Sequence, residues 1–130
     1  MALVPDDLKY TKEHEWVRLA DTEGTIGITD YAQNQLGDIV YVELPQIGAK
    51  VEQFETFGVI ESVKAASDMF APVSGEVIAV NDAIRDHPEV INQSPYDDGW
   101  IIRMKLSDLS EIDVLMSPSD YKAFVESLGE

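Results

Sequence analysis

The sequence of 130 residues contains no cysteine. It therefore has no disulfide framework and no cysteine nucleophile, and any thiol chemistry would need sulfur from a cofactor. A zinc enzyme is also disfavoured, because zinc needs three or four soft or imidazole ligands and the two histidines, His14 and His87, lie far apart in the chain. We expect no metal site.

Long apolar runs and targeting segments are missing as well. No run reaches the length needed to cross a bilayer. The N-terminus reads MALVPDDLKYTKEHEW and resembles neither a signal peptide nor an Arg-rich transit peptide. These features predict a cytoplasmic protein of bacterial type, or the mature form of a mitochondrial matrix protein.

Basic residues are scarce. The chain has 9 Lys and Arg against 25 Asp and Glu, a formal net charge of -16. Such a charge repels phosphate backbones and anionic lipids, so we expect neither nucleic acid nor a membrane as a partner. It favours fast, salt-sensitive encounters with basic protein surfaces, although an acidic balance also serves solubility alone.

The motifs of self-contained enzymes are missing too. No glycine-rich loop precedes a Lys-Ser or Lys-Thr pair, and the pair Ser74-Gly75 follows a proline turn instead of forming a nucleophile elbow. Carboxylates are numerous, but so acidic a chain pairs them by chance. Nothing in the sequence argues for an enzyme.

Short strand-forming segments dominate the chain. They are bounded by Gly, Asp or Pro and span residues 14–20, 24–29, 38–45 and 99–108. In the third segment, one face is predicted to hold Val40, Val42 and Leu44. In the fourth, apolar and basic residues alternate. One face is predicted to hold the apolar residues Trp100, Ile102, Met104 and Leu106. The opposite face is predicted to hold Arg103 and Lys105.

Helices are predicted at two places. Residues 29–37 have Thr29 or Asp30 as N-cap and Gly37 as the stop. A second helix is predicted at the C-terminus, where Ser117 is the N-cap, Pro118 occupies the first turn and Asp120 closes a capping box. Its apolar residues form one stripe that should pack on the core: Tyr121, Phe124, Val125 and Leu128. Residues 85–93 and 97–100 are predicted to be loops. The pattern indicates one domain, 1–130, that is a small β-sandwich or barrel with helical additions.

Lys64 is the only basic residue between positions 51 and 84. It lies between two strand-forming segments, 57–63 and 66–77, and so at the tip of a candidate hairpin. The turn has no Asn-Gly or Asp-Gly pair, but a type I turn accepts most residues. At such a tip the long side chain would present its amine to another protein, the alternative being an ordinary surface lysine.

The stretch around Lys64, GVIESVKAASDMFAPVSGEV, resembles the modification hairpin of biotinyl and lipoyl carrier domains. In these domains a lysine at a strand turn receives the cofactor through an amide bond. Biotin carriers usually flank that lysine with methionines, whereas Val63 and Ala65 stand here, which favours lipoate. Three further segments resemble the H-protein family of the glycine cleavage system, from Leu8 to Leu128: KYTKEHEWV, GTIGITDYAQNQLGDIVYVELPQIGAKV and INQSPYDDGWIIRMK.

The resemblance implies a mainly β fold, a flattened sandwich or barrel hybrid of two antiparallel sheets with quasi-twofold symmetry. It implies a lipoyl-like core over about 24–106, short helices, and a C-terminal helical addition over about 108–129. The cofactor would be lipoate on Lys64, attached by lipoate-attaching enzymes, and the protein is expected to be a monomer.

The resemblance also implies the reaction partners. A glycine decarboxylase with pyridoxal phosphate would load an aminomethyl group onto the carrier. An aminomethyltransferase would pass it to tetrahydrofolate, and a dihydrolipoyl dehydrogenase with FAD would reoxidise the arm. By position in the matching motifs, Glu15 and Asp68 are expected to contact the ammonium end of the loaded arm.

Three other functions stay open. A relay protein that donates lipoyl or octanoyl groups to other apoproteins would have the same motif around Lys64. A lipoyl domain of a 2-oxo acid dehydrogenase complex is shorter and leads into an Ala/Pro-rich linker, which this chain lacks. A free-standing enzyme is the third.

Overall fold

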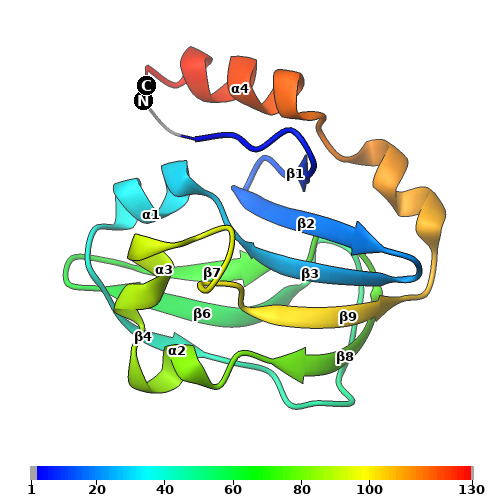
Figure 1. The fold of residues 1–130 in the computed structure, drawn as a ribbon, viewed down its shortest axis with the longest axis horizontal. Coiled ribbons are helices and arrows are strands. Elements are labelled where there is room, and N and C mark those ends of the chain that lie inside the picture. The colour runs from blue at the N-terminus through cyan, green and yellow to red at the C-terminus, as the bar shows by residue number, and fades with distance from the viewer. Residues whose placement is uncertain (1–2, 130) are drawn as a thin grey trace.

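The computed structural model describes residues 3–129 and is mainly β, with two antiparallel sheets packed face to face (Figure 1). The larger sheet contains, in spatial order, β1 (Lys9–Tyr10), β2 (Glu15–Ala20), β3 (Glu23–Ile28), β9 (Ile102–Leu106), β8 (Gly75–Val80) and β5 (Lys50–Val51). The smaller contains β4 (Ile39–Glu43), β6 (Thr56–Ser62) and β7 (Ala66–Phe70). The predicted two-sheet fold is confirmed, and the sheets do not close into a barrel.

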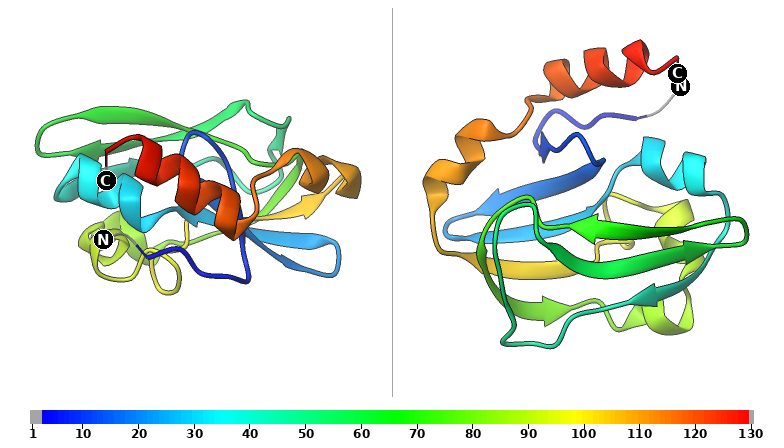
Figure 2. Two further views of the ribbon diagram at one scale, coloured as in Figure 1. Left: turned by 90° about the horizontal axis from the view of Figure 1, so that it is seen from above. Right: turned by 180° about the vertical axis from the view of Figure 1, so that it is seen from behind.

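Helices surround the sheets at the edges. They are α1 (Asp30–Leu36), α2 (Ala83–Asp86), α3 (Glu89–Gln93), the 3-10 helix η1 (Leu109–Val114) and α4 (Pro118–Ser127). Figure 2 shows α4 on the outside of the molecule, next to the N-terminal segment. None of the helices in residues 3–129 has the length and apolar character needed to span a bilayer.

The alternation predicted for β9 is confirmed for residues 102–106. Its apolar side chains are buried between the sheets and its two basic side chains are exposed, because successive residues of a strand point to opposite faces. Trp100 does not share the buried face: it precedes the strand, is only partly buried in a second cluster, and has Arg103 over its ring at 5.7 Å. The main core draws on both sheets: Val17, Ile26 and Met104 come from the larger, and Val42, Ile60 and Met69 from the smaller.

The face predicted for β4 is wrong. Val40 is 54% exposed, while Ile39 and Val42 are each 3% exposed. The pairing of β4 with β6 is irregular between Ile39 and Tyr41. An extra residue at such a bulge reverses the alternation on one side of it, so Val40 points to solvent.

The segment 66–77 is not one strand. It divides into β7 of the smaller sheet and β8 of the larger one, joined by residues 71–74. Pro72 lies in this connection and has no N–H to donate to a ladder, which favours a break there. The chain therefore crosses between sheets eight residues after Lys64.

Residues 85–93 are not a loop. Helices α2 and α3 occupy most of the segment and place Ile84 and Ile91 in the core, both at 0% exposure. Pro88, with φ -62°, precedes the first residue of α3, where its fixed dihedral suits a helix start. The burial of two isoleucines gives these short helices their stability.

The predicted caps of the other helices are confirmed. Thr29 accepts the Ala32 N–H at the start of α1, and α1 ends at Gly37, which has φ +80°. Ser117 accepts the Asp120 N–H at the start of α4. In the predicted stripe of α4, Leu128 is an exception at 48% exposure, because it follows the last turn and lies beyond the packing surface.

Candidate functional site

Lys64 lies at the tip of the β6–β7 hairpin, as the sequence predicts. The pairing of Glu61 with Ala66 closes the two strands, and residues 63–65 form the exposed turn. The hairpin tip lies at one end of the molecule, near α1 (Figure 1, Figure 2). The Lys64 side chain passes over Gly37 at the end of α1, with Cε 3.5 Å from the place of a Cβ on that glycine.

Ser62 fixes the backbone of this turn. Its N–H donates to the Ala65 carbonyl at 2.7 Å, and its Oγ accepts the N–H groups of Lys64 at 3.3 Å and Ala65 at 3.1 Å. The Val63 N–H donates to the Asp38 carbonyl at 3.0 Å, which ties the turn to the start of β4. The sequence reasoning missed Ser62, although a serine just before a turn is a known signal for this arrangement.

Lys64 forms no ion pair among the described residues. The ion pairs of residues 3–129 involve Arg18, Arg85 and His87. Acylation of the Lys64 amine would therefore remove a positive charge without breaking an ion pair seen in this structure. An exposed amine on a backbone held by hydrogen bonds is a suitable acceptor for an acyl group.

Glu15 lies at the first position of β2 and is only 1% exposed. The Thr11 hydroxyl donates to Glu15 Oε1 at 2.6 Å, and the Phe70 N–H donates to Oε2 at 3.1 Å. Burial raises the pKa of Glu15 to about 7, and these hydrogen bonds offset only part of that effect. Glu15 thus joins β2 of one sheet to the end of β7 in the other.

Asp68 lies on the exposed side of β7, paired with Val59 of β6. It is four residues from Lys64, or about 13 Å along the strand at roughly 3.3 Å per residue. Asp68 thus belongs to β7 itself, whereas Glu15 belongs to β2 and reaches β7 only through its hydrogen bond with the Phe70 N–H. The structure exposes the carboxylate of Asp68 and buries that of Glu15.

His14, the neighbour of Glu15, belongs to a buried network that holds α4. Its Nδ1 lies 2.9 Å from the Tyr121 hydroxyl, which lies 2.7 Å from Thr29 Oγ1. Burial lowers the pKa of His14 and so favours the neutral ring. Within residues 3–129 no group of three or more His, Cys, Asp or Glu side chains could hold a metal ion, and the structure gives His14 a packing role.

Comparisons with known proteins agree over nearly the whole chain. The family model described as glycine cleavage H-protein matches residues 8–128. The chain belongs to this family. It is 50% identical to the glycine cleavage system H protein of Carboxydothermus hydrogenoformans over 130 residues, which is 100% of both chains. It is 56% identical to that of Geobacillus kaustophilus over 121 residues, 93% of this chain and 95% of the relative.

A solved structure shows the same fold. The crystal structure of a glycine cleavage system H protein from Mycobacterium marinum superposes with a TM-score of 0.86 and 34% sequence identity, covering 98% of this chain and all of the other. Membership of the glycine cleavage H-protein family makes the chain a lipoyl carrier in glycine cleavage, which works with the enzymes of that system and is not itself a catalyst.

Proposed function

We propose that Lys64 is the lysine that receives lipoate in amide linkage. The chain then shuttles the aminomethyl group of glycine from the decarboxylase to the aminomethyltransferase, and the dehydrogenase restores the arm. The bound lipoyl group supplies a disulfide that accepts the aminomethyl group and electrons. The chain supplies the display of that group, the docking surfaces and protection from water.

The observation that supports this proposal is the turn around Lys64. The amine is exposed and forms no ion pair in the described structure, while the backbone on both sides is hydrogen-bonded to Ser62 and Asp38. Once an enzyme binds the carrier, a cofactor tethered there would be present at a high effective concentration near the active site of that enzyme. The absence of cysteine also spares the lipoyl disulfide from exchange within the chain.

The direct functional test is Lys64→Arg in a reconstituted glycine cleavage system. Arginine keeps the positive charge but cannot form the same amide, so glycine decarboxylation should fall to background. The position is an exposed turn, so the free energy of unfolding should change by less than about 0.5 kcal/mol. Lys122→Arg, on the exposed side of α4, is the matched control and should stay fully active. Activity of the Lys64 variant, or its unfolding, would contradict the proposal.

We also propose acidic contacts for the loaded arm. Asp68 is the direct candidate, because its carboxylate is exposed on the strand that follows Lys64. A carboxylate near the aminomethyl nitrogen would stabilise its positive charge, and closure against the protein surface would exclude water. Glu15 can take part only if its hydrogen bonds with Thr11 and Phe70 open.

The lifetime of the aminomethyl group tests these contacts. Loaded carriers with Asp68→Asn, Glu15→Gln or both should release formaldehyde faster than the wild type when no partner enzyme is present. Lipoylation of Lys64 should be unchanged, which separates protection of the arm from its attachment. Equal rates of release in all four proteins would show that neither carboxylate protects the arm.

A further inference from the structure

Phe54 has a backbone conformation that bulky residues rarely adopt. It lies in the turn between β5 and β6 with φ +67°, and its side chain is 51% exposed. For a side chain of this size the left-handed region is a real outlier. Such strain persists only where the surroundings impose it, and it is concentrated at functional positions.

Backbone hydrogen bonds to the neighbouring connection impose this conformation. The Phe54 N–H donates to the Ala71 carbonyl at 2.6 Å, and the Ala71 N–H donates to the Glu55 carbonyl at 2.9 Å. The Glu55 N–H donates to the Glu52 carbonyl at 3.0 Å and closes the turn. The ring of Phe54 is therefore held outward by a fixed backbone.

Gln53 fastens the same turn to two other segments. Its N–H donates to Ser74 Oγ at 2.8 Å, and its side-chain amide donates to the carbonyls of Pro72 at 3.0 Å and Glu111 at 3.2 Å. The turn is thus attached both to the β7–β8 connection and to η1. A partner that contacts Phe54 therefore meets a turn whose backbone is already ordered, which lowers the entropic cost of binding.

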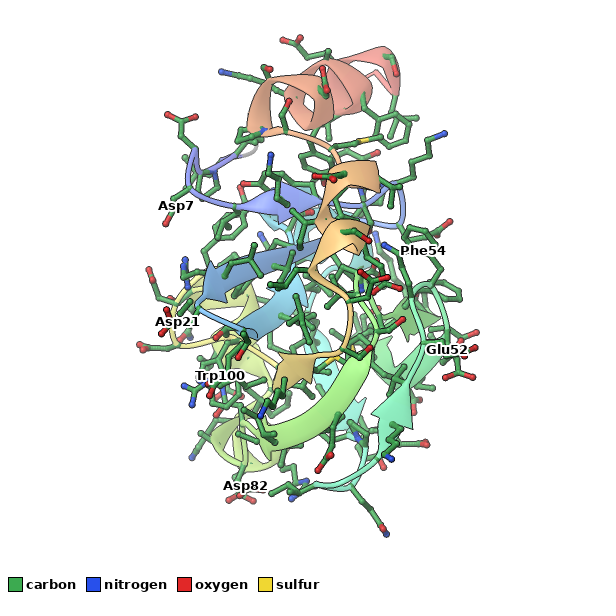
Figure 3. All side chains as sticks on the ribbon, turned by 90° about the vertical axis from the view of Figure 1, so that its right-hand side faces the viewer. Asp7, Asp21, Glu52, Phe54, Asp82 and Trp100 are labelled. Atoms are coloured by element: carbon green, nitrogen blue, oxygen red, sulfur yellow. The ribbon has the colours of Figure 1, made fainter. Side chains whose placement is uncertain are left out.

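A cavity of about 480 Å³ lies beside Phe54. Its apolar lining includes Tyr10, Phe54, Phe70, Val114, Leu115 and Met116. The volume and the apolar lining are those of a site that accepts a small molecule or an inserted side chain. Figure 3 looks onto the side of the molecule that carries Phe54.

This cavity is at the opposite end of the hairpin from Lys64. Phe70 pairs with Thr56 at the base of β6 and β7, whereas Ala66 begins β7 next to the tip. Since β7 has 5 residues, its two ends, Ala66 and Phe70, are four steps or about 13 Å apart at roughly 3.3 Å per residue. A protein interface of roughly 800 Å² per partner is about 30 Å across, which is wide enough to span both.

The surroundings of the cavity are acidic. Glu52 and Glu55 flank Phe54, Asp113 precedes Val114, and Glu13 lines the cavity; all four acids are exposed. Lys12 is the only basic residue in the lining. An occupant with positive charge around an apolar centre would be complementary in both respects.

We propose that Phe54 and this cavity form a second docking surface for an enzyme of the glycine cleavage system. The occupant is a loop of that enzyme that inserts an apolar side chain next to Phe54 and surrounds it with Lys or Arg. The inference rests on the proposed function and adds a place of contact away from the lipoyl-lysine. In this proposal the strained turn at Phe54 binds the partner enzyme, while the lipoyl group on Lys64 enters the active site of that enzyme.

Phe54→Gly separates this role from a structural one. Glycine adopts φ +67° without strain, so the loss of ring contacts is offset and Tm should stay within about 3 °C of the wild type. Removal of an aromatic anchor should raise the KM for the lipoylated carrier about tenfold with at least one of the three enzymes. The kcat should hold, because the chemistry occurs at the arm.

Two further variants complete the test. Glu13→Gln combined with Glu52→Gln should raise the same KM and flatten its dependence on ionic strength. The control is Leu19→Ser, which changes an apolar residue of β2 that is 40% exposed. This variant should change neither the KM nor its dependence on ionic strength. The carrier should sediment as a monomer throughout.

The outcomes separate the two proposals. If the wild-type carrier works and the KM of Phe54→Gly is unchanged with all three enzymes, the docking surface is overturned and the proposed function stands. If the wild type supports none of the three reactions, both fail. Self-association that Phe54→Gly abolishes would assign the cavity to a second copy of the chain and overturn the proposal as well.

Discussion

Glu15 shows how burial of a single carboxyl makes stability depend on pH. Its pKa is raised from 4.5 to about 7, mainly because it is removed from water. The folded protein therefore binds a proton that the unfolded chain releases between these pH values. Stability must fall as pH rises through this window, by an amount on the order of 3 kcal/mol for this one group.

Glu15→Gln should remove that fall. The amide oxygen can still accept the Phe70 N–H and the amide NH₂ can donate to Thr11 Oγ1, so the link between the sheets survives without a charge. In urea unfolding from pH 4.5 to 8, the variant should gain stability relative to the wild type as pH rises. Parallel curves for the two proteins would show that Glu15 ionises normally.

For single residues, the sequence shows which side chain to single out, but it does not show how buried or strained that residue is in the fold. The place of Lys64 at a hairpin tip could be predicted because it is a lone lysine between two strand-forming segments, and the structure confirms that place. The burial of Glu15 could not be predicted, because Thr11 and Phe70 come together only when two sheets pack. The strain at Phe54 also escapes local reasoning, since distant carbonyls impose it.

The tip of the β6–β7 hairpin is held by two backbone hydrogen bonds and by the Ser62 hydroxyl, which accepts the N–H groups of Lys64 and Ala65. Ser62→Ala removes the acceptor of two N–H groups, and water can replace it in part because the turn is exposed. The cost should be at most about 1 kcal/mol. The turn should become more mobile, so hydrogen exchange at the amides of Lys64 and Ala65 should speed up and lipoylation should slow.

Ser67→Ala is the matched control for that change. Ser67 is exposed on the same hairpin, and within residues 3–129 its hydroxyl makes one hydrogen bond, donated to the Asp68 carbonyl at 3.3 Å. Exchange at residues 64 and 65 should be as slow in this variant as in the wild type. Unchanged exchange in Ser62→Ala would mean that the strands alone define the tip.

Elements are predictable where a local pattern decides them. The alternation of β9 and the caps of α1 and α4 are local, and all were predicted correctly. The bulge in β4 depends on its partner strand, so the face of Val40 was wrong. Helices α2 and α3 are too short for a periodic pattern, and the core that buries Ile84 and Ile91 stabilises them.

For the whole molecule, the order of strands could not come from local pattern. Ile26 pairs with Ile102 from a distant part of the chain, and neither segment specifies its neighbour. The local pattern left a sandwich and a barrel open, and the resemblance over nearly the whole length supplied the arrangement of two antiparallel sheets, which the structure confirms. The net charge of -16 is also a property of the whole molecule, and with basic partners it would steer successive encounters.

We propose that Lys64 is modified and that the fold serves to present it. The most direct test is peptide mapping by mass spectrometry of the protein made in cells with lipoate and lipoate-attaching enzymes. We expect one lipoyl group on Lys64 and none on the other five lysines. A biotinyl group on Lys64, a lipoyl group on another lysine, or an unmodified Lys64 in lipoate-replete cells would contradict it.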